Sequence, residues 1–493
     1  MLDSDLKNVP LCVDLDGTLI KTDSLYELFL LLFKKNPLYC IIAISWLMKS
    51  KAHFKAEITK RVQLSAESLP YNQDVIDYIK AQDPKRKILL VTGSNKKVAD
   101  SVAEHLGLFD EVIASDSNIN LTGNNKKDHL VERFGDVSDS SGDASDSSKS
   151  GFEYIGNEKT DLPVWKVAKK VSVVSQDNSF LNEVKTSFEN VETFITPTPT
   201  IKNYLKGIRL HQWVKNLLVF IPLFLDHRFN DGQAFVQVLL TFFGLSILAS
   251  FTYIINDLLD LESDRMNKTK CKRPFASGLI SIKQSAVMMA VLFVILVAIL
   301  TQLSASVVLV LMIYLAATLA YSFYLKRVAM LDVTMLAGLF SLRIIAGIVA
   351  INSSWSFWLL AFSMFFFLSL AFAKRFSEIE NLRKEGREKA SGRGYTVADL
   401  PMLNSSGVAA GYISILVVAL YIDSEKVQQM YAHPEILWLI CPPLLFWIGR
   451  IWLITGRGEM HEDPIVFAIK DKVSLFVVSL CGLILMGATL YKG

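Results

Sequence analysis

Three carboxylates recur at helical spacing where a long apolar run gives way to a basic segment: Asp257, Asp260 and Asp264. On a helix that turns by about 100° per residue they fall within about 60° of one another, whereas Glu262 points to the far side. Carboxylates crowded on one face repel each other unless a cation lies between them, and Mg²⁺ favours one or two carboxylates together with phosphate oxygens. The spacing therefore predicts a site for Mg²⁺ and a diphosphate.

The segment that follows these acids is strongly basic, with Lys268, Lys270, Lys272 and Arg273. A charge run at a helix end is most often a solvated surface, and that is the alternative here. The apolar run before the acids and the bases after them favour a functional site at the membrane edge, because acids suit a metal ion and bases suit phosphates.

A second pair of acids follows a short apolar stretch near the start of the chain, in Leu11–Thr18 (LCVDLDGT). This stretch predicts a buried strand that runs into a tight turn, and open α/β sheets place their chemistry at the carboxyl ends of their strands. Asp14 could attack phosphorus, Asp16 could protonate the leaving oxygen, and Mg²⁺ would offset the accumulated charge. The alternative is a strand and turn that carry acids by coincidence.

Further predicted strands bring more polar groups to this domain: residues 87–94 with Thr92, residues 152–155, residues 171–174 and residues 191–195. Between the first two strands, about residues 23–78 form a helical insertion with two apolar runs flanked by lysines. Each run is too short to cross about 30 Å of hydrocarbon. A cap lying on the bilayer surface and a buried helical hairpin are both open.

The DLDGT stretch resembles the nucleophile motif of the haloacid-dehalogenase-like phosphohydrolases. The resemblance implies an α/β Rossmann-like domain over residues 1–195 with a helical cap, in which Asp14 and Asp16 are catalytic and bind Mg²⁺ with Asp161. It also implies that Thr92 and Lys126 bind phosphate. The chain departs from the family pattern at Asn157, where an aspartate is usual, so a regulatory or inactive domain stays open.

Residues 256–264 (NDLLDLESD) match the NDxxDxxxD signature of the UbiA prenyltransferase superfamily. The resemblance implies an all-α membrane bundle of about nine helices over residues 207–493, with Asp257 and Asp260 catalytic, Asp264 as a further Mg²⁺ ligand and Asn256 at the substrate. It also implies a wider substrate-binding set, which comprises Lys215, Lys272, Arg273, Tyr321, Lys326, Asp332 and Arg343.

Two of these positions, Arg343 and Lys215, have alternative interpretations, and one polar loop outside the set is a further candidate. Arg343 lies within an apolar span, where a charge is costly and marks a site unless it is a structural ion pair. Lys215 enters an apolar run after Trp213, which itself is more simply an interfacial anchor. A polar loop with His461, Glu462 and Asp463 could touch the rim of the site.

Three segments resemble one branch of the superfamily, decaprenyl-phosphate phosphoribosyltransferase and its relatives: residues 212–220, 272–278 and 321–332. The branch transfers 5-phosphoribose from phosphoribosyl pyrophosphate to a polyprenyl phosphate, and the fused phosphatase would then remove the 5-phosphate. An aromatic prenyltransferase using a polyprenyl diphosphate is the alternative, and a non-enzymatic membrane protein is a second one.

The elements that position these residues differ between the two halves of the 493-residue chain. The net charge of +3 argues against a nucleic-acid partner, and the five scattered cysteines indicate neither disulfides nor zinc. Residues 137–150 form a low-complexity, disordered loop, and residues 196–206 form a linker. Nine apolar spans are expected, at roughly 212–226, 234–257, 284–302, 305–324, 331–351, 354–373, 405–422, 435–455 and 473–491.

Basic loops concentrate on one side of these spans. The positive-inside rule therefore places that side, the acidic motif and the N-terminal domain in the cytoplasm. The chain lacks a basic start followed by an apolar core, so no secretory signal is expected. We expect a multi-pass protein of the bacterial inner (cytoplasmic) membrane, and a homo-oligomer is left open.

Overall fold

The computed structural model describes residues 9–116, 120–136, 151–228, 230–388, 393–431, 433–460 and 463–490. The predicted disordered loop 137–150 lies outside these residues, as do His461 and Glu462. The chain forms two compact units, one of residues Met1–Leu210 and Tyr253–Val291, the other of His211–Thr252 and Leu292–Gly493. Each unit is described by itself.

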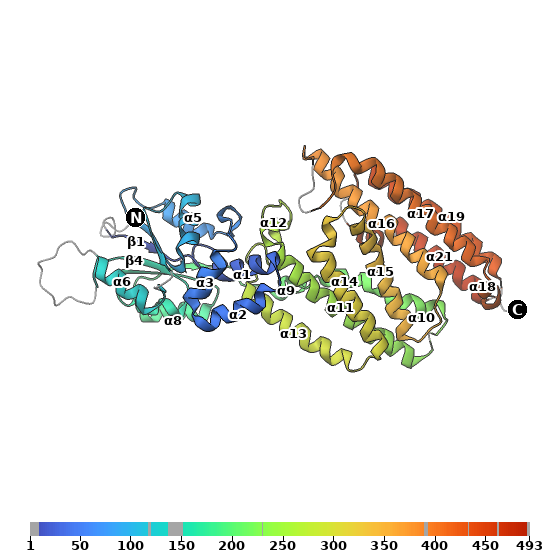
Figure 1. The fold of residues 1–493 in the computed structure, drawn as a ribbon, viewed down its shortest axis with the longest axis horizontal. Coiled ribbons are helices and arrows are strands. Elements are labelled where there is room, and N and C mark those ends of the chain that lie inside the picture. Colours follow the sequence, from blue (N-terminus) through green and yellow to red (C-terminus); the bar gives the residue numbers. More distant parts are fainter. Residues whose placement is uncertain are drawn as a thin grey trace, which may run out of the picture. The chain divides into compact units, whose positions relative to one another are not determined.

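The first unit is built on a six-stranded parallel sheet with the order β3-β2-β1-β4-β5-β6 (Figure 1). The strands are β1 Leu11–Val13, β2 Ile88–Asn95, β3 Glu111–Ser115, β4 Glu153–Gly156, β5 Lys170–Ser175 and β6 Glu192–Ile195. The α/β class and five of these strands were predicted. The sequence did not reveal β3, a five-residue edge strand in which only Ile113 and Ser115 are buried.

Helices cover both faces of this sheet. Leu11 and Val13 of β1 face a core shared with α4 Gln73–Lys80 and α5 Lys96–Leu106. Cys12 faces the opposite core, which α6 Asn124–Phe134, α7 Leu162–Trp165 and α8 Asn178–Ser187 complete. The alternation of side chains along a strand thus explains why β1 is buried on both faces.

The predicted helical insertion consists of α1 Ser24–Lys35, α2 Tyr39–Lys49 and α3 Lys51–Thr59, followed by the short turn η2 Ala66–Ser68 and by α4. Asp23 caps α1 by accepting a hydrogen bond from the Leu25 amide at 2.9 Å. Several apolar side chains of α2 are exposed, among them Ile41 (70%) and Met48 (84%). Leu28 and Leu32 of α1 are buried in the core, so the two predicted apolar runs differ: that of α1 is buried on one face, and that of α2 is largely exposed.

The predicted linker 196–206 is only partly extended. Helix α9 occupies Ile201–Gly207, and the Asn203 side chain accepts hydrogen bonds from the Thr200 amide at 2.9 Å and the Thr200 hydroxyl at 2.6 Å. This reciprocal cap satisfies amides at the helix start, which a Pro-Thr stretch by itself does not predict. The extended part ends at Thr200.

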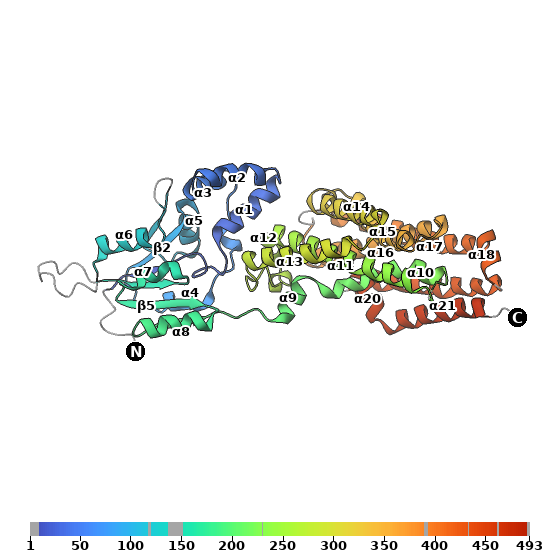
Figure 2. The same cartoon turned by 90° about the horizontal axis from the view of Figure 1, so that it is seen from below.

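Eight helices of the described chain are long and apolar enough to cross a membrane. They are α11 Gly232–Leu259, α13 Ile282–Leu300, α14 Ala305–Phe323, α15 Leu331–Ala350, α16 Phe357–Lys384, α17 Leu400–Ile422, η8 Pro434–Ile440 continued by α19 Cys441–Gly456, and α21 Lys472–Leu490. In the second unit α16 lies beside α15 and α17, as both views show (Figure 2).

The count of nine predicted spans is not confirmed among the described residues. Residues 210–225 form a shorter apolar segment, η4 Leu210–Phe220 followed by α10 Ile221–Leu225. Pro222 lies at the start of α10, where the 3₁₀ turns of η4 give way to an α-helix. The backbone of the segment packs closely against α15, since a Cβ added to Gly347 would lie 2.1 Å from the Val219 carbonyl oxygen. This contact fixes the segment that carries Lys215.

Breaking the buried Arg86–Glu153 ion pair tests how much it contributes to the stability of the sheet domain. Glu153 is completely buried and accepts hydrogen bonds from Arg86 at 2.7 Å, Tyr78 at 2.7 Å and Ser172 at 3.0 Å. Glu153→Ala leaves the Arg86 charge uncompensated and should lower the free energy of unfolding by about 3–5 kcal/mol. Calorimetry of the full-length protein in detergent measures this, with Glu111→Ala, which breaks an exposed ion pair to Arg133, as a control expected within about 1 kcal/mol.

Candidate functional site

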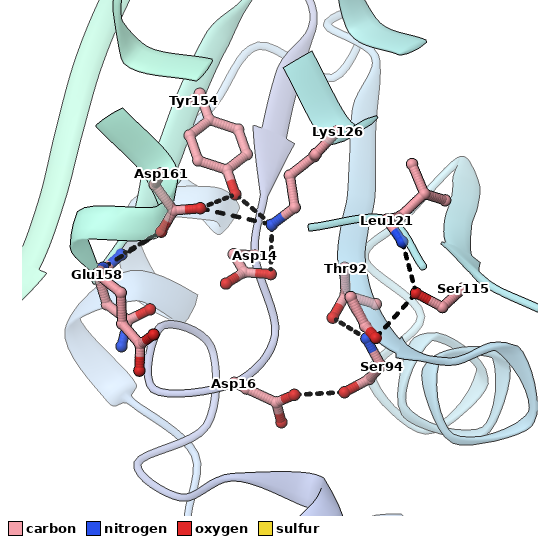
Figure 3. A network of polar contacts seen from close by, with 12 residues as sticks. Asp14, Asp16, Thr92, Ser94, Ser115, Leu121, Lys126, Tyr154, Glu158 and Asp161 are labelled. Carbon is pink, nitrogen blue, oxygen red and sulfur yellow. Dashed lines mark hydrogen bonds and ion pairs between the residues drawn. The ribbon is translucent and has the colours of Figure 1, made fainter. Parts of the chain in front are cut away.

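The first polar site lies at the carboxyl end of β1 in the first unit (Figure 3). The Lys126 ammonium donates to Asp14 Oδ1 at 3.1 Å and to the Tyr154 hydroxyl at 2.6 Å, and it lies 3.5 Å from Asp161 Oδ1. The Tyr154 hydroxyl in turn donates to Asp161 at 2.8 Å. The parallel strands β1 and β4 thus bring together residues separated by more than a hundred positions in the chain.

Burial and charge tune this cluster. Burial raises the pKa of Asp14 to about 7, an effect that Lys126 opposes and Asp161 reinforces. For Lys126, burial works against the charged form, but the carboxylates of Asp14 and Asp161 outweigh it and raise the pKa. The cluster therefore holds a buried cation beside the carboxylate expected to be the nucleophile.

Asp16 is turned away from Lys126 toward the cap helix. It accepts hydrogen bonds from the Ser24 amide at 2.7 Å and from the Ser94 hydroxyl. The Thr92 hydroxyl, which is completely buried, accepts from the Ser94 amide at 3.0 Å. Figure 3 shows Asp16 and Thr92 each joined to Ser94 by a dashed line. The two predicted residues are thus joined by a serine that the sequence reading did not single out.

Asn157 lies over the turn that follows β1. A Cβ added to Gly17 would lie 2.1 Å from Asn157 Nδ2, and Gly17 has a φ of +71°, so only glycine fits there. Asp161 accepts the amides of Asn157 at 3.0 Å and Glu158 at 3.2 Å. The predicted Mg²⁺ set of Asp14, Asp16 and Asp161 is not gathered into a group that could hold a metal ion among the described residues. Asp14 and Asp161 lie together at Lys126, whereas Asp16 is bound by Ser24 and Ser94.

The second polar site, also in the first unit, lies around the acidic motif. Arg273 Nη1 donates to Asp264 Oδ2 at 2.6 Å and to Asp257 Oδ1 at 3.2 Å, so two of the three predicted carboxylates meet at one nitrogen. Lys270 lies 3.9 Å from Asp264. Burial raises the pKa of Asp264, and Arg273 and Lys270 oppose that rise.

Arg209 also binds the Asp257 carboxylate. It donates to Asp257 at 2.5 Å and 3.3 Å, and its guanidinium lies 4.9 Å from the centre of the Tyr253 ring. Arg209 has a φ of +53°, a conformation that costs energy for a residue with a side chain. Strain at a residue that holds a candidate metal ligand is typical of functional sites.

The predicted trio of carboxylates is not assembled as a cluster. Among the described residues, no group of three His, Cys, Asp or Glu side chains is placed to hold a metal ion. Asp260 lies between α11 and α12 Leu261–Arg265. Arg209 and Arg273 bind the Asp257 carboxylate, and Arg273 also binds Asp264. The pair Asp257 and Asp264, surrounded by Arg209 and Arg273, still fits one Mg²⁺ ion with a diphosphate, because Mg²⁺ needs few protein carboxylates.

Two other residues that were predicted to bind the substrate, Asn256 and Lys272, lie in or near this motif. Asn256 is half-buried, and its carbonyl accepts from the Asp260 amide at 3.0 Å. Lys272 is exposed at the end of the short turn η5 Lys270–Lys272. Their assignment to substrate binding stays a prediction.

A third polar site lies in the second unit. Asp463 Oδ2 is 3.0 Å from Lys215 and 2.8 Å from Lys374, and Lys215 is buried. The two lysines hold the pKa of Asp463 well below its usual range although burial acts in the opposite direction. Two cations and one anion meet here, so the cluster carries excess positive charge.

Arg343 is fully engaged next to this cluster. It donates to the Asn216 side chain at 2.8 Å, to the Leu339 carbonyl at 2.5 Å and to the Tyr314 hydroxyl at 2.9 Å. None of these partners is acidic, so the alternative of a structural ion pair is not what the structure shows. The buried guanidinium keeps its positive charge.

Asp332 is enclosed by polar side chains in the structure. It is completely buried, lies 2.6 Å from Arg375 and accepts from the Tyr395 hydroxyl at 2.6 Å. Its assignment to substrate binding stays a prediction. Tyr321, in the last turn of α14, and Lys326, in η6 Leu325–Arg327, are half-buried.

An apolar cavity of about 760 Å³ lies in the second unit, lined by residues of α10, α15, α16, α17, α19, α21 and of α20 Pro464–Lys470. The polar cluster adjoins it, since the Ile465 amide donates to Asp463 Oδ1 at 3.2 Å and Ile465 lines the cavity. The Phe340 ring, which lies 5.8 Å from the Lys215 ammonium, stacks at 4.8 Å on Phe367 of the cavity wall. The cavity suits a long apolar chain with a charged end.

The model of the UbiA prenyltransferase family matches residues 228–480, about half of the chain. The chain belongs to the UbiA prenyltransferase family. With its eight apolar helices, this UbiA member is a multi-pass membrane protein, and its family is one of transferases. The acidic motif and the clusters around Lys215 and Asp332 all lie within or beside the matched region.

Three relatives are similar in sequence to this UbiA member. Uncharacterized protein y4nM of Sinorhizobium fredii is 37% identical over 485 residues, covering 97% of this chain and 91% of its own. Nodulation protein NoeC of Azorhizobium caulinodans is 31% identical over 275 residues, 56% of this chain and 89% of its own. Decaprenyl-phosphate phosphoribosyltransferase of Mycolicibacterium smegmatis is 29% identical over 303 residues, 60% of this chain and 94% of its own.

Several residues at these sites were not assigned roles from the sequence. They are Ser24, Ser94, Tyr154, Arg209, Lys374, Arg375 and Tyr395. The charges within apolar helices, Lys374 and Arg375 among them, carried a signal, because such residues mark buried sites. The serine and tyrosine partners gave no such signal in the sequence, since only the fold brings them to the carboxylates.

Removing one carboxylate tests the metal site. In an Asp14→Asn background, Asp257→Asn should weaken Mn²⁺ binding in the presence of pyrophosphate by more than about tenfold, because even outer partners of a metal are worth about 10–100-fold. Electron paramagnetic resonance of the full-length protein measures free Mn²⁺. Glu262→Gln, an exposed acid of the following helix α12, is the matched control. Equal affinity in both variants would contradict a metal at Asp257.

Proposed function

We propose that the membrane half transfers 5-phosphoribose from phosphoribosyl pyrophosphate to a polyprenyl phosphate with Mg²⁺ as cofactor. The observation that carries this proposal is the excess of positive charge around Asp463, where Lys215 and Lys374 meet beside an apolar cavity of about 760 Å³. Buried cations in excess call for an anion. A polyprenyl phosphate supplies both the anion and an apolar chain, whereas a neutral aromatic acceptor supplies no anion.

The similarity to a relative named decaprenyl-phosphate phosphoribosyltransferase supports the same substrate class. In the proposed reaction the bond between ribose C1 and the pyrophosphate oxygen breaks, and an oxygen of the acceptor phosphate bonds to C1. The acceptor is already an anion, so the protein has no proton to remove. Its residues instead hold the two phosphate groups in place.

Arg209, Arg273 and Lys270 would hold the diphosphate, and Asp257 and Asp264 would hold the metal ion. When bound, Mg²⁺ stabilises the charge that develops on the departing pyrophosphate. Because arginine forms paired hydrogen bonds with phosphate as readily as with carboxylate, Arg273 can exchange its carboxylate partners for the diphosphate.

The N-terminal domain is proposed to be a phosphohydrolase that removes the 5-phosphate from the lipid product. Asp14 attacks phosphorus and forms an aspartyl phosphate, Asp16 protonates the departing sugar oxygen, and water then releases inorganic phosphate. Lys126 and Tyr154 hold Asp14 and Asp161. Both sites are proposed to face the cytoplasm of a bacterial inner membrane.

The transfer reaction is tested with purified protein, labelled phosphoribosyl pyrophosphate and polyprenyl phosphate. Asp257→Asn should lower the rate of lipid labelling on the order of 10²-fold or more, because it removes charge that holds the leaving group. Lys215→Ala should lower kcat/KM for polyprenyl phosphate by roughly 10–100-fold, since hydrogen bonds to charged groups are worth about 1.5–3 kcal/mol.

The control is Lys202→Ala, an exposed lysine of α9, which should leave labelling unchanged. Labelled lipid is identified by mass spectrometry. If the wild-type protein forms no phosphoribosyl lipid but prenylates an aromatic acceptor from a prenyl diphosphate, the proposal is wrong and the aromatic prenyltransferase is right.

The phosphohydrolase is tested on the lipid product. Asp14→Asn should abolish release of the 5-phosphate without reducing lipid labelling, because the amide cannot act as the nucleophile. Release of inorganic phosphate is measured beside the labelled lipid. Asp128→Asn, an exposed acid of α6, should leave both readings unchanged. Phosphate release that does not depend on Asp14 would contradict this part of the proposal.

A further inference from the structure

A cavity of about 460 Å³ lies in the first unit and reaches the first polar site at Asp16 and Asn157. One wall comes from the turn after β1 and from the cap, with Asp16, Gly17 and Asp23, and from Asn157 after β4. The other wall comes from residues 277–284, which follow the acidic motif and include the first residues of α13. Residues of the sheet domain and residues 277–284, which follow the acidic motif, therefore line one pocket within this unit.

A buried ion pair fastens the second wall to the cap. Arg265, the last residue of α12, donates to Glu27 of α1 at 2.6 Å and 3.2 Å, and both side chains are buried. Arg265 also donates to the Ala276 carbonyl at 2.9 Å, and the Thr22 hydroxyl donates to Glu27 at 2.8 Å. A guanidinium held by three acceptors in this way fixes the start of residues 277–284 against α1.

Backbone packing fixes the same wall a second time. Gly278 has a φ of +73°, and a Cβ added there would lie 3.0 Å from Lys21 Cβ and 3.4 Å from the Lys21 carbonyl oxygen. Only glycine allows this turn and this approach. The wall is therefore a built part of the pocket.

The lining of the pocket indicates its ligand. Carboxylates of Asp23 and Glu158 can accept hydrogen bonds from sugar hydroxyls, and hydroxyls of Ser277 and Ser281 add further partners. The cations are Lys21 and Lys283. Lys283 is exposed, lies 3.9 Å from Glu158, and its ammonium lies 5.5 Å from the Tyr26 ring centre. A cation at the outer edge, away from Lys126 at the sheet, suits a second phosphate on the same sugar.

We propose that this pocket binds a sugar with two phosphates, one presented to Asp14 and the other held at Lys283 by the wall of residues 277–284. The inference rests on the proposed function, in which the substrate is a 5-phosphoribosyl group joined to a lipid through a second phosphate. Lys283 then determines specificity for a lipid-linked or otherwise doubly phosphorylated sugar over a free sugar monophosphate. The membrane domain in this way supplies part of the phosphatase site.

The test compares two soluble probes, ribose 1,5-bisphosphate and ribose 5-phosphate, on full-length protein in detergent. In wild type, kcat/KM for 5-phosphate release should be higher for the bisphosphate. Lys283→Ala should lower kcat/KM for the bisphosphate about tenfold, mainly through KM, and leave ribose 5-phosphate within about twofold. Lys283→Arg should restore the preference. Lys80→Ala, an exposed lysine of α4 outside the pocket, is the matched control.

Three outcomes would overturn the inference. They are an equal loss with both probes, which indicates a structural role, an unchanged bisphosphate reaction in Lys283→Ala, and no hydrolysis of either probe by wild type. Lipid labelling from phosphoribosyl pyrophosphate is measured on the same preparations. If labelling persists while the Lys283 effect is absent, the inference fails and the transfer reaction stands; if labelling is absent, the proposed transfer fails independently.

Discussion

The pairing of buried carboxylates with cations is the constraint on which this structure depends. An ionised carboxylate loses its water when it is buried, and only a nearby cation or a set of hydrogen bonds offsets that cost. The chain meets the constraint with a lysine at Asp14, arginines at Asp257 and Asp332, and two lysines at Asp463. Each of these pairs lies where a site was sought.

The same pairing decides which sites can take a ligand. The Asp332 carboxylate is enclosed by Arg375 and Tyr395, so it stabilises the fold around it. Asp257 and Asp264 share Arg273, which lies at the edge of the site and is only partly buried. A partly exposed cation such as Arg273 can exchange its carboxylate partner for a phosphate, whereas an enclosed cation such as Arg375 stays with its carboxylate. The distinction rests on exposure, because both kinds of pair have similar distances.

The first unit joins two groups of candidate site residues through contacts between residues that are far apart in sequence. Glu27 and Arg265 are separated by 238 positions, yet they form a buried ion pair. Arg265 follows Asp264 directly, and Glu27 lies on the helix whose first residue, Ser24, binds Asp16. The phosphohydrolase-like residues and the acidic motif are therefore held by one continuous set of contacts within a single unit.

The sequence by itself determined the two-part architecture, because a strand followed by DLDGT and a series of long apolar runs each have a distinct periodicity and length. It also singled out Asp14 with Lys126, and Asp257 with Arg273, as neighbours in two candidate sites. Only the tertiary structure decided that Arg273 joins Asp257 to Asp264, that Asp332 is enclosed and that residues 277–284 line a pocket with Asp16. Helical spacing fixes directions along one element, whereas partners such as Arg209, Ser94 and Lys374 come from other elements, whose approach no local pattern encodes.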